Sequence, residues 1–466
     1  MLIDTLVAEI GSTTTVINAF SNITGSENDA SGSLPKFLGQ GQAPTTVLDG
    51  DVNIGLTNAI KDLKKNLGLD DIKYNRILAT SSAAGGLRMT VHGLVHDMTV
   101  RAAKEAALGA GAIIKMVTSG KLRPSELQKI ISIKPNLILV AGGVDYGERD
   151  TALYNFEKIA KLNLKVPVIY AGNIDNHDDI KFLAEQYNVK VYITENVYPK
   201  VDFLNVEPTR KIIQDAFEDH IIHAPGMTRV RELVDGHIIP TPGAVMEAAK
   251  LLYQHIGDLI VFDVGGATTD LHSVTAGSED INLILTNPEP IAKRTVEGDL
   301  GVFVNLIHIV EKIGLDNLKK EFPDAEELIK NAKPIPETTR EIEFIERLTL
   351  EAVLTALERH AGAFRSFYTP SGRRTVAEGK DLTVIKYIIG TGGALTRLPN
   401  RIKILEQVKT AYKNTDKLYP KNNPSILIDN QYIMASLGVL SKEYPGKALH
   451  LLYQSLNFKE SQESYL

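Results

Sequence analysis

Two stretches of the chain show the same succession of apolar strand, small-residue turn and apolar strand. Residues 5–11 (TLVAEIG) and 14–20 (TTVINAF) flank the first turn, and residues 258–274 (DLIVFDVGGATTDLHSV) contain the second. Apolar runs bounded by Gly, Ser and Thr are typical of paired strands. A third segment, 384–398 (VIKYIIGTGGALTRL), has the pattern of a strand that runs through glycines into a helix. The chain therefore carries one long-range repeat, with a glycine-rich hairpin in each half.

From about residue 88 the pattern changes to short apolar strands that alternate with helices. We predict strands at 137–143, 166–173 and 189–197, and helices at 98–117, 149–162 and 177–187. Such alternation is typical of a parallel, doubly wound unit, which we predict to be inserted between the two hairpins. Outside it we predict a loop or hairpin at 21–35, a strand at 76–82, and helices at 56–67, 243–253 and 431–442.

The two hairpins have the composition of phosphate-binding turns. Turns of Gly, Ser and Thr expose consecutive backbone N–H groups that can converge on an anionic oxygen. Each turn glycine follows a strand-end carboxylate by two residues: Glu9 precedes Gly11 and Asp263 precedes Gly265. Phosphoryl transfer needs donors for phosphate and a carboxylate for Mg²⁺ or water. The predicted phosphate-binding residues are Gly11, Ser12, Thr13, Thr14, Gly265, Gly266 and Thr268, and the predicted adenosine-binding residues are Gly390, Gly392 and Gly393.

Each candidate also has a purely structural interpretation. Asp263 and Glu9, the predicted catalytic and metal-binding carboxylates, could instead cap a turn or accept buried hydrogen bonds. Asp270 could pair only with backbone amides. The acidic pair Glu297 and Asp299 could hold a metal or lie in an exposed loop.

Histidine pairs give a weaker signal. His92 and His96, like His220 and His223, lack a third nearby ligand, and we interpret both pairs as structural. The segment 81–86 (SSAAGG) has no G-x-S-x-G pattern, so it does not predict a nucleophile elbow. The chain also has no P-loop motif.

Composition narrows the class of protein. The 466 residues are 43% hydrophobic and 23% charged, with a net charge of −6, which argues against a general nucleic-acid or anionic-membrane binder. The N-terminal residues show no signal-peptide pattern and no apolar run is long enough for a membrane span, so a cytoplasmic location is expected. With no cysteine, the chain has no disulfide and no cysteine-held zinc or iron–sulfur cluster. That also excludes the iron–sulfur activator ATPases of hydroxyacyl-CoA dehydratases.

The three glycine-rich junctions resemble the phosphate-1, phosphate-2 and adenosine motifs of the actin-like ATPase superfamily of sugar kinases, heat-shock chaperones and actin. The segments around Gly243 and Ala244, and around Ala435, Ser436 and Gly438, resemble its two connecting helices. The resemblance implies two ribonuclease-H-like lobes that bind ATP or ADP with Mg²⁺ between them. Glu9 replaces the usual aspartate of the first motif, Val16 replaces the lysine common in kinases, and residues 239–244 lack the acidic residue that chaperones carry there.

A closer resemblance, over nearly the whole chain, is to the GlmL/MutL family. The segments that carry this resemblance are FLGQGQAPTTVLDGDVNIG (37–55), SSAAGGLRMTVHGL (81–94), AALGAGA (106–112) and RTVEGDLGV (294–302). These proteins are accessory to methylaspartate (glutamate) mutase and related cobalamin-dependent aminomutases. The resemblance implies an ATP-driven reactivating chaperone whose partners are adenosylcobalamin-dependent mutase subunits. A small-molecule kinase of the acetate or sugar kinase type and a filament-forming actin relative are the alternatives.

The fold class expected from these features is α/β: a two-lobed actin-like ATPase with an inserted Rossmann-like domain. We place the first lobe at 1–87, the insert at 88–225 as a partner-binding arm, and the first connecting helix at 226–256. The second lobe is placed at 257–430, and the second connecting helix and tail at 431–466.

Overall fold

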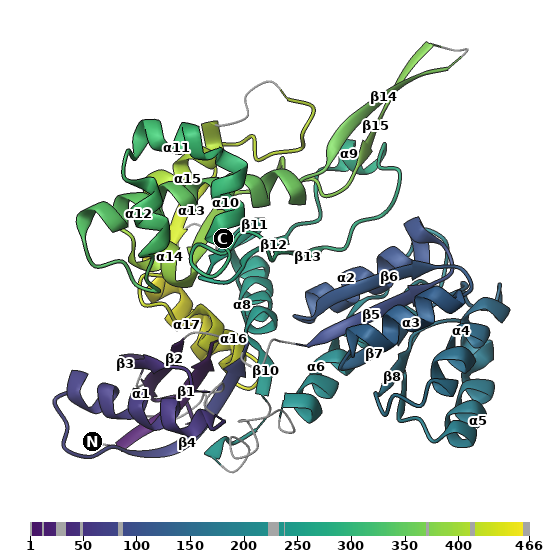
Figure 1. Ribbon diagram of the computed structural model, residues 1–466, viewed down its shortest axis with the longest axis horizontal. Helices are drawn as coiled ribbons and strands as arrows, with labels where there is room; N and C mark the ends of the chain where they lie inside the picture. Colours follow the sequence, from purple (N-terminus) through teal and green to yellow (C-terminus); the bar gives the residue numbers. More distant parts are fainter. Residues whose placement is uncertain are drawn as a thin grey trace, which may run out of the picture.

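A five-stranded mixed sheet forms the first lobe of the computed structural model (Figure 1). The model describes residues 2–11, 14–24, 34–46, 50–82, 87–221, 233–236, 238–369, 372–410 and 415–459. The strand order is β10-β4-β1-β2-β3. The strands are β1 (Leu2–Ile10), β2 (Thr14–Ser21), β3 (Lys36–Pro44), β4 (Lys73–Ser81) and β10 (Ile238–Pro240). Strands β1, β2 and β3 pair as antiparallel neighbours, whereas β4 and β10 run parallel to β1. Helix α1 (Val52–Asn66) packs on β2 and β3.

The second lobe repeats this arrangement strand for strand. Its sheet has the order β13-β12-β11-β16-β17, again with three antiparallel strands followed by two parallel ones. The strands are β11 (Leu259–Val264), β12 (Thr269–Val274), β13 (Ala292–Glu297), β16 (Tyr387–Thr391) and β17 (Ser425–Ile428). Two helices, α8 (Thr241–Ile256) and α16 (Met434–Leu440), follow the last strand of each sheet and pack against each other.

The third sheet is parallel throughout and lies between β4 and β10 in the sequence. Its order is β6-β5-β7-β8-β9, which is a doubly wound topology. The strands are β5 (Arg88–Gly93), β6 (Ile113–Ser119), β7 (Leu137–Val140), β8 (Val168–Tyr170) and β9 (Val191–Ile193). The predicted α/β class, with two lobes of matching topology and an inserted Rossmann-like parallel domain, is confirmed. The exact domain limits stay a prediction.

One predicted helix is wrong in its second half. Residues 98–117 form η1 (His96–Val100) and α2 (Arg101–Gly109), but then β6 begins at Ile113. Gly111 has a φ of +97°, and a side chain there would meet Pro240, so the chain turns sharply against the first lobe. The apolar, β-branched run that follows satisfies its hydrogen bonds along β5.

The remaining elements cover the sheets. The insert contains α3 (Pro124–Ile133), α4 (Asp150–Lys161), η2 (Ile174–Asn176), α5 (His177–Tyr187) and α6 (Glu207–Ile221). The second lobe contains α9 (Glu279–Asn282), α10 (Leu306–Ile313), α11 (Leu315–Glu321), α12 (Ala325–Lys330), α13 (Thr339–His360), α14 (Gly392–Arg397) and α15 (Arg401–Thr410), and α17 (Pro445–Ser455) packs on α8 and α16. A separate hairpin, β14 (Ala363–Thr369) with β15 (Gly372–Glu378), projects from the second lobe.

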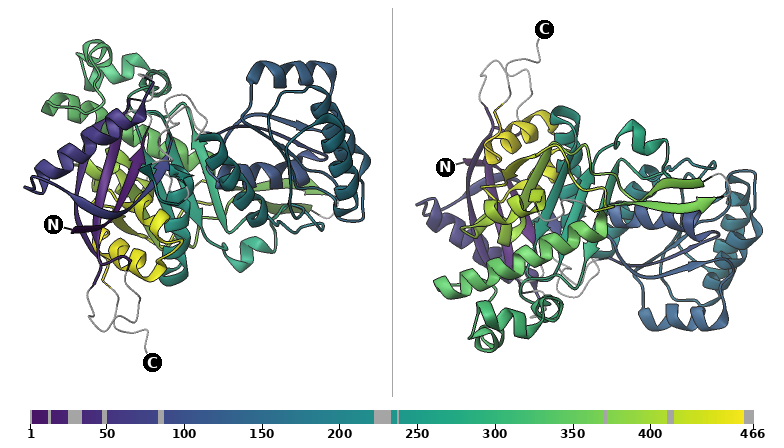
Figure 2. Two further views of the ribbon diagram at one scale, coloured as in Figure 1. Left: turned by 90° about the horizontal axis from the view of Figure 1, so that it is seen from below. Right: turned by 90° about the horizontal axis from the view of Figure 1, so that it is seen from above.

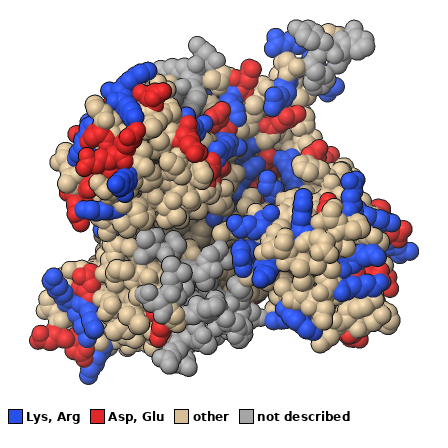
Figure 3. All heavy atoms as spheres, in the orientation of Figure 1, with Lys and Arg blue, Asp and Glu red and all other residues tan. Residues whose placement is uncertain are grey.

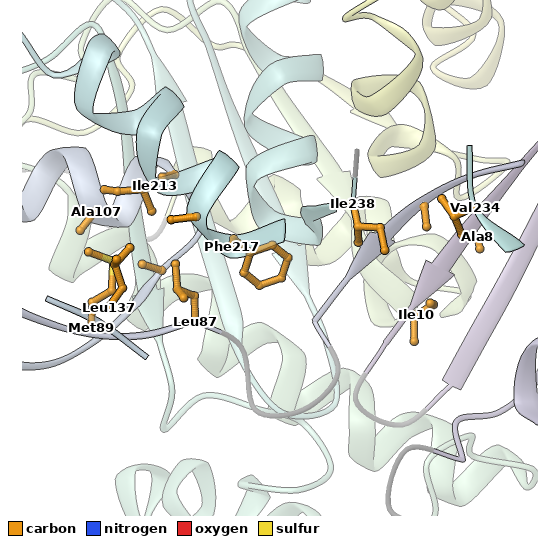
Figure 4. Close-up of a cluster of buried hydrophobic side chains, with 14 of the residues drawn as sticks. Ala8, Ile10, Leu87, Met89, Ala107, Leu137, Ile213, Phe217, Val234 and Ile238 are labelled. Atoms are coloured by element: carbon orange, nitrogen blue, oxygen red, sulfur yellow. The ribbon is translucent and has the colours of Figure 1, made fainter. Parts of the chain in front are cut away.

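The insert shares a hydrophobic core with the first lobe. One face of its sheet, with Leu137 and Leu139, packs under α2 and α6, and these side chains belong to the same buried cluster as Ala8 and Ile10 of β1 (Figure 4). The other face, with Ile138 and Val140, packs under α3, α4 and α5 in a cluster of its own. The insert lies at one end of the molecule (Figure 2). One apolar face of its sheet anchors it to the first lobe.

Acidic and basic side chains intermingle over the visible face of the molecule (Figure 3). Lys and Arg gather where the second lobe faces the insert, without forming one continuous basic surface. Among the helices of the described ranges, none is long and apolar enough to cross a bilayer.

Candidate functional site

The two predicted turns have the same closing hydrogen bond. At the end of β1 the N–H of Gly11 donates to the carbonyl of Thr14 at 2.9 Å, and at the end of β11 the N–H of Gly265 donates to that of Thr268 at 3.0 Å. Ser12 and Thr13, predicted for the first turn, lie outside the described residues. Matched strand ends and matched turns give the lobes equivalent loops.

Both turns face one cleft of about 150 Å³ between the lobes. Seven residues predicted for the site line it: Glu9, Gly11, Thr14, Asp263, Gly265, Gly266 and Thr268. Val16, Ser82, Thr241, Pro242, Ala267, Asp270 and Tyr432 complete the lining. Residues far apart in the sequence therefore meet at the place that the hairpin repeat indicates.

Glu9 is buried and held by the second connecting helix. Its Oε1 accepts hydrogen bonds from the Ser436 hydroxyl at 2.6 Å, the Ser436 N–H at 3.2 Å and the Asn18 amide at 3.2 Å. Burial, and then the nearby carboxylates of Asp429 and Asp263, raise the pKa of Glu9 to about 7. This carboxylate is thus fixed in place and readily takes up a proton in the absence of a cation.

Asp263 lies opposite Asp270 in the β11–β12 ladder. Burial and the Asp270 carboxylate raise the pKa of Asp263 to about 7, although the guanidinium of Arg294 opposes the shift. Arg294 donates to the Asp270 Oδ1 from Nη2 at 2.8 Å and from Nε at 3.2 Å. Asp270 is therefore paired with an arginine, whereas Asp263 has its carboxylate toward the cleft.

The three glycines of the third predicted junction have different surroundings. Gly392 has a φ of +82°, and a Cβ there would lie 2.4 Å from the Asp263 Oδ1, so its lack of a side chain leaves room for that carboxylate. Gly390 is packed under Leu405 and Ile428 rather than at a cavity. A Cβ on Gly393 would meet nothing within 4 Å.

Gly393 opens onto a second, more apolar cavity of about 370 Å³ that shares Thr14, Gly265, Gly266 and Tyr432 with the cleft. Its other walls come mainly from the second lobe. They are formed by Gln42, Val302, Phe303, Pro334, Ile335, Pro336, Ile342, Ile345, Ala394, Arg397, Leu398 and Pro399. A polar compartment that adjoins an apolar one suits a ligand with an anionic end and a planar, apolar end.

Three residues at or near the cleft were not found from the sequence. Tyr432 lines both cavities with a left-handed φ of +53°, which is a strained conformation for a tyrosine. Asp429 is buried and accepts from Thr391, Ile433, Met434 and Ser455. Arg294 pairs with Asp270. Arg294 lies in the segment 294–302 that carries the family resemblance, but neither it nor the other two residues could be assigned to the cleft, because their partners come from other elements.

The chemistry of the cleft fits a cation accompanied by an anion. Among the described residues of its lining, three are carboxylates and none is Lys or Arg. A phosphate chain alone would be repelled there. Over the described part of the chain, no group of three His, Cys, Asp or Glu is placed to hold a metal by itself. This donor set suits Mg²⁺, which is usually held by one or two carboxylates together with phosphates and waters.

The other candidates lie elsewhere. Glu297 and Asp299 both pair with Arg359, at 2.6 and 2.7 Å, outside the cleft lining. His92 is fully buried between Thr90 and Thr118, whereas His96 is exposed beside Asp97, so they do not face a common ligand. His223 lies outside the described residues, as does the side chain of His220.

Because Glu9 is buried with a raised pKa, the free energy of unfolding should depend on pH. The folded state keeps the Glu9 proton up to about pH 7, whereas the unfolded chain loses it near the ordinary value of 4.5. The stability that this proton contributes to the folded state is fully present below the unfolded-state pKa of 4.5. It is lost as the pH rises through the folded-state pKa of about 7. Relative to Glu9→Gln, the ligand-free wild type should therefore lose on the order of 1–3 kcal/mol of unfolding free energy between about pH 5 and pH 8.

Chemical denaturation of both proteins at the two pH values measures this difference. Gln keeps the acceptor oxygen for Ser436 and Asn18, which makes it a conservative reference. Parallel pH profiles for the two proteins would show that Glu9 is ionised in the folded state.

The chain is similar to one family of known proteins over most of its length. A model of the MutL protein family matches residues 5–456. Protein MutL of Clostridium tetanomorphum is 37% identical over 427 residues, which cover 88% of this chain and 92% of that protein.

Two solved structures illustrate the more distant similarities. Nucleotide-free acetone carboxylase aligns over 94% of this chain and 70% of its own, with 10% identity and a TM-score of 0.41. A propionate kinase from Francisella tularensis subsp. tularensis SCHU S4 aligns over 94% and 98%, with 11% identity and a TM-score of 0.27.

Proposed function

The chain belongs to the MutL protein family, and from this premise we propose that it binds ATP or ADP with Mg²⁺ in the cleft between its lobes. The observation that carries the proposal is the pair of matched turns, from Gly11 to Thr14 and from Gly265 to Thr268, which face each other across one cavity. Each turn ends a strand that also supplies a carboxylate. Such a pair can hold a phosphate chain from both sides.

The two cavities suggest how a nucleotide is oriented. The phosphates would lie between the turns, and the nucleoside would occupy the apolar cavity beside Gly393, Ile342 and Ile345. Arg397 lies with its guanidinium 5.8 Å from the centre of the Tyr432 ring and also donates to the Gln40 side chain of the first lobe at 3.0 Å. This contact joins the lobes beside the apolar cavity.

Asp263, with Glu9 behind it, would hold Mg²⁺, either directly or through water. The cation would supply charge neutralisation for the phosphates and for the charge that builds during their hydrolysis. Asp263 would orient the attacking water or a metal-bound water. The hydrogen bonds from Ser436 and Asn18 keep Glu9 in position for the same purpose.

The biological role that we propose is ATP-driven reactivation of an adenosylcobalamin-dependent mutase, glutamate mutase or a related ornithine or lysine aminomutase. It follows from the GlmL/MutL motifs, and the inserted domain would be the arm that contacts the mutase. Closure of the lobes on nucleotide would then move that arm.

A kinase of the acetate or sugar kinase type is the second candidate, and the cleft gives it less support. Val16 stands where many kinases have a lysine, and none of the described residues that line the cleft is a Lys or Arg that could take its place. A coupled ADP assay separates the two: a kinase needs an added acceptor, whereas a chaperone-type ATPase releases ADP without one.

Gly393→Phe tests the nucleoside position. A side chain there enters open space, so folding stability should be nearly unchanged while the ring occupies the apolar cavity. Calorimetry with MgADP should show affinity reduced by about tenfold or more, since a filled pocket cannot bury the base. Gly298→Phe is the matched control, because that position is also open but lies outside both cavities. Equal affinity in both variants would contradict the assignment, and no binding by the wild type would overturn nucleotide binding itself.

A further inference from the structure

A single buried arginine connects the cleft to the inserted domain. Arg294 of β13 is 2% exposed. On one side its guanidinium holds the Asp270 carboxylate with two hydrogen bonds, and on the other its Nη1 donates to the Leu108 carbonyl at 3.0 Å. Asp270 belongs to the second hairpin and lines the cleft, whereas Leu108 lies in the last turn of α2 in the insert. One side chain therefore touches both.

The end of α2 is a place where a small displacement would be transmitted. The last carbonyls of a helix have no partner within it, and a cationic donor stabilises them. The Leu108 carbonyl accepts from the Gly111 N–H at 2.9 Å, and Arg294 is its second donor. Immediately beyond Leu108, Ala110 and Gly111 pack against Gly243 and Pro240 at the start of the connecting helix α8. The C-terminus of α2 is thus held between β13 and the helix that joins the lobes.

The charges around Arg294 respond to what the cleft contains. Asp270 and Asp263 lie opposite each other in the ladder, so the guanidinium is shared electrostatically between two carboxylates. A cation bound at Asp263 would compete with Arg294 for this negative charge. The cation would thereby change the balance between the guanidinium's bonds to Asp270 and its bond to the Leu108 carbonyl, which favours a different position of α2.

We propose that Arg294 couples nucleotide occupancy of the cleft to the position of the inserted domain, an inference that rests on the nucleotide binding proposed above. Arg294 is a positioning residue, since it is not among the described residues that line the cleft and its hydrogen bonds go to Asp270 and Leu108. Its planar fork is essential, because three donors in fixed geometry can bridge a carboxylate and a carbonyl at once. A lysine at this position could serve only one of them well.

A second buried arginine provides the matched control. Arg210 of α6 is 3% exposed and donates to the carbonyls of Ala292 in β13 at 2.7 Å and Glu105 in α2 at 3.4 Å. It therefore crosses the same interface, but it is not among the described residues that line the cleft, and its hydrogen bonds go to other residues. The ion pairs Arg101–Glu289 and Lys293–Glu105 reinforce this interface in both variants.

The test compares Arg294→Lys with Arg210→Lys in the full chain. Hydrogen exchange of the peptide that covers α2 is measured with and without MgADP, and calorimetry measures MgADP binding to each protein. In the wild type and in Arg210→Lys, the nucleotide should change the exchange rate of α2 by about tenfold. In Arg294→Lys, MgADP should still bind, but this change should be lost.

The outcomes separate the two proposals. If the wild type does not bind nucleotide, the proposed function fails. If it binds but α2 does not respond, or if Arg294→Lys keeps the response, only the coupling fails. An equal loss in both variants would indicate a generally loosened interface and would also overturn the role of Arg294. Should Arg294→Lys not fold, Arg294→Gln, whose amide keeps one donor for the Asp270 carboxylate or the Leu108 carbonyl, replaces it in the same comparison.

Discussion

Asp263→Asn is expected to reduce ATP hydrolysis on the order of 10²-fold or more while reducing nucleotide affinity by only a modest factor. Asparagine has the same shape, so the close approach of Gly392 to the side-chain oxygen is preserved. The backbone N–H groups of both turns stay in place. What is lost is the negative charge that a cation or an activated water requires, and that charge matters most as the transition state forms.

Steady-state hydrolysis and MgADP calorimetry on the same preparation measure the two effects. The substitution should not unfold the protein, because the pKa of Asp263 is already raised to about 7 and asparagine resembles the protonated acid. Equal losses in binding and turnover would mean that Asp263 only shapes the loop. Unchanged turnover would move the catalytic carboxylate elsewhere, with Glu9 as the next candidate.

Gly438→Ala is expected to destabilise the protein by about 3 kcal/mol or more. A Cβ on Gly438 would lie 1.8 Å from the carbonyl oxygen of Ala244 and 2.6 Å from its carbon. Both are backbone atoms of α8, so neither can rotate away, and the two connecting helices must separate. Because α16 also carries Ser436, the hydrogen bonds that fix Glu9 would be disturbed together with the packing.

Thermal and denaturant unfolding measure this effect, and Gly298→Ala is the control. A Cβ on Gly298 would meet nothing within 4 Å, so its stability should differ from that of the wild type by roughly 0.5 kcal/mol or less. A Gly438→Ala protein as stable as the control would show that α8 and α16 do not approach as closely as described.

The hairpins could be predicted because their signal is local. A strand, a turn of small residues and a second strand occupy consecutive positions, 5–20 in the first hairpin and 258–274 in the second, and the turn glycine fixes where the carboxylate two residues earlier must lie. The same holds for α4, whose predicted limits differ from the observed ones by one residue at each end, and for α5, whose predicted limits coincide with the observed ones. The edge strand β6 was missed because the Ala-rich helix before it hides the break, and that break depends on Gly111 packing against Pro240 in another element.

Other parts of the site have no local signal at all. Glu9 accepts hydrogen bonds from Asn18 and Ser436, residues that the sequence separates by 418 positions. Arg294 begins the segment RTVEGDLGV that carries the family resemblance, but that segment does not tell which carboxylate the arginine pairs with. Nothing in the sequence around Asp429 distinguishes a buried charge from an exposed one. The apolar cavity similarly combines residues of α13, α14 and the segment before α13, so its existence follows from tertiary packing alone.

The core shared by the first lobe and the insert also bears on how this family can diversify. A domain attached through two linkers can be lost or exchanged between relatives with little consequence for its host. Here Leu137 and Leu139 of the insert belong to the same buried cluster as Ala8 and Ile10 of the lobe. A change of insert must therefore be accompanied by compensating changes in α2, α6 and the lobe beneath them. Relatives that serve different partners are expected to vary on the outward side of the insert, over α3, α4 and α5, and to inherit the inward side almost unaltered.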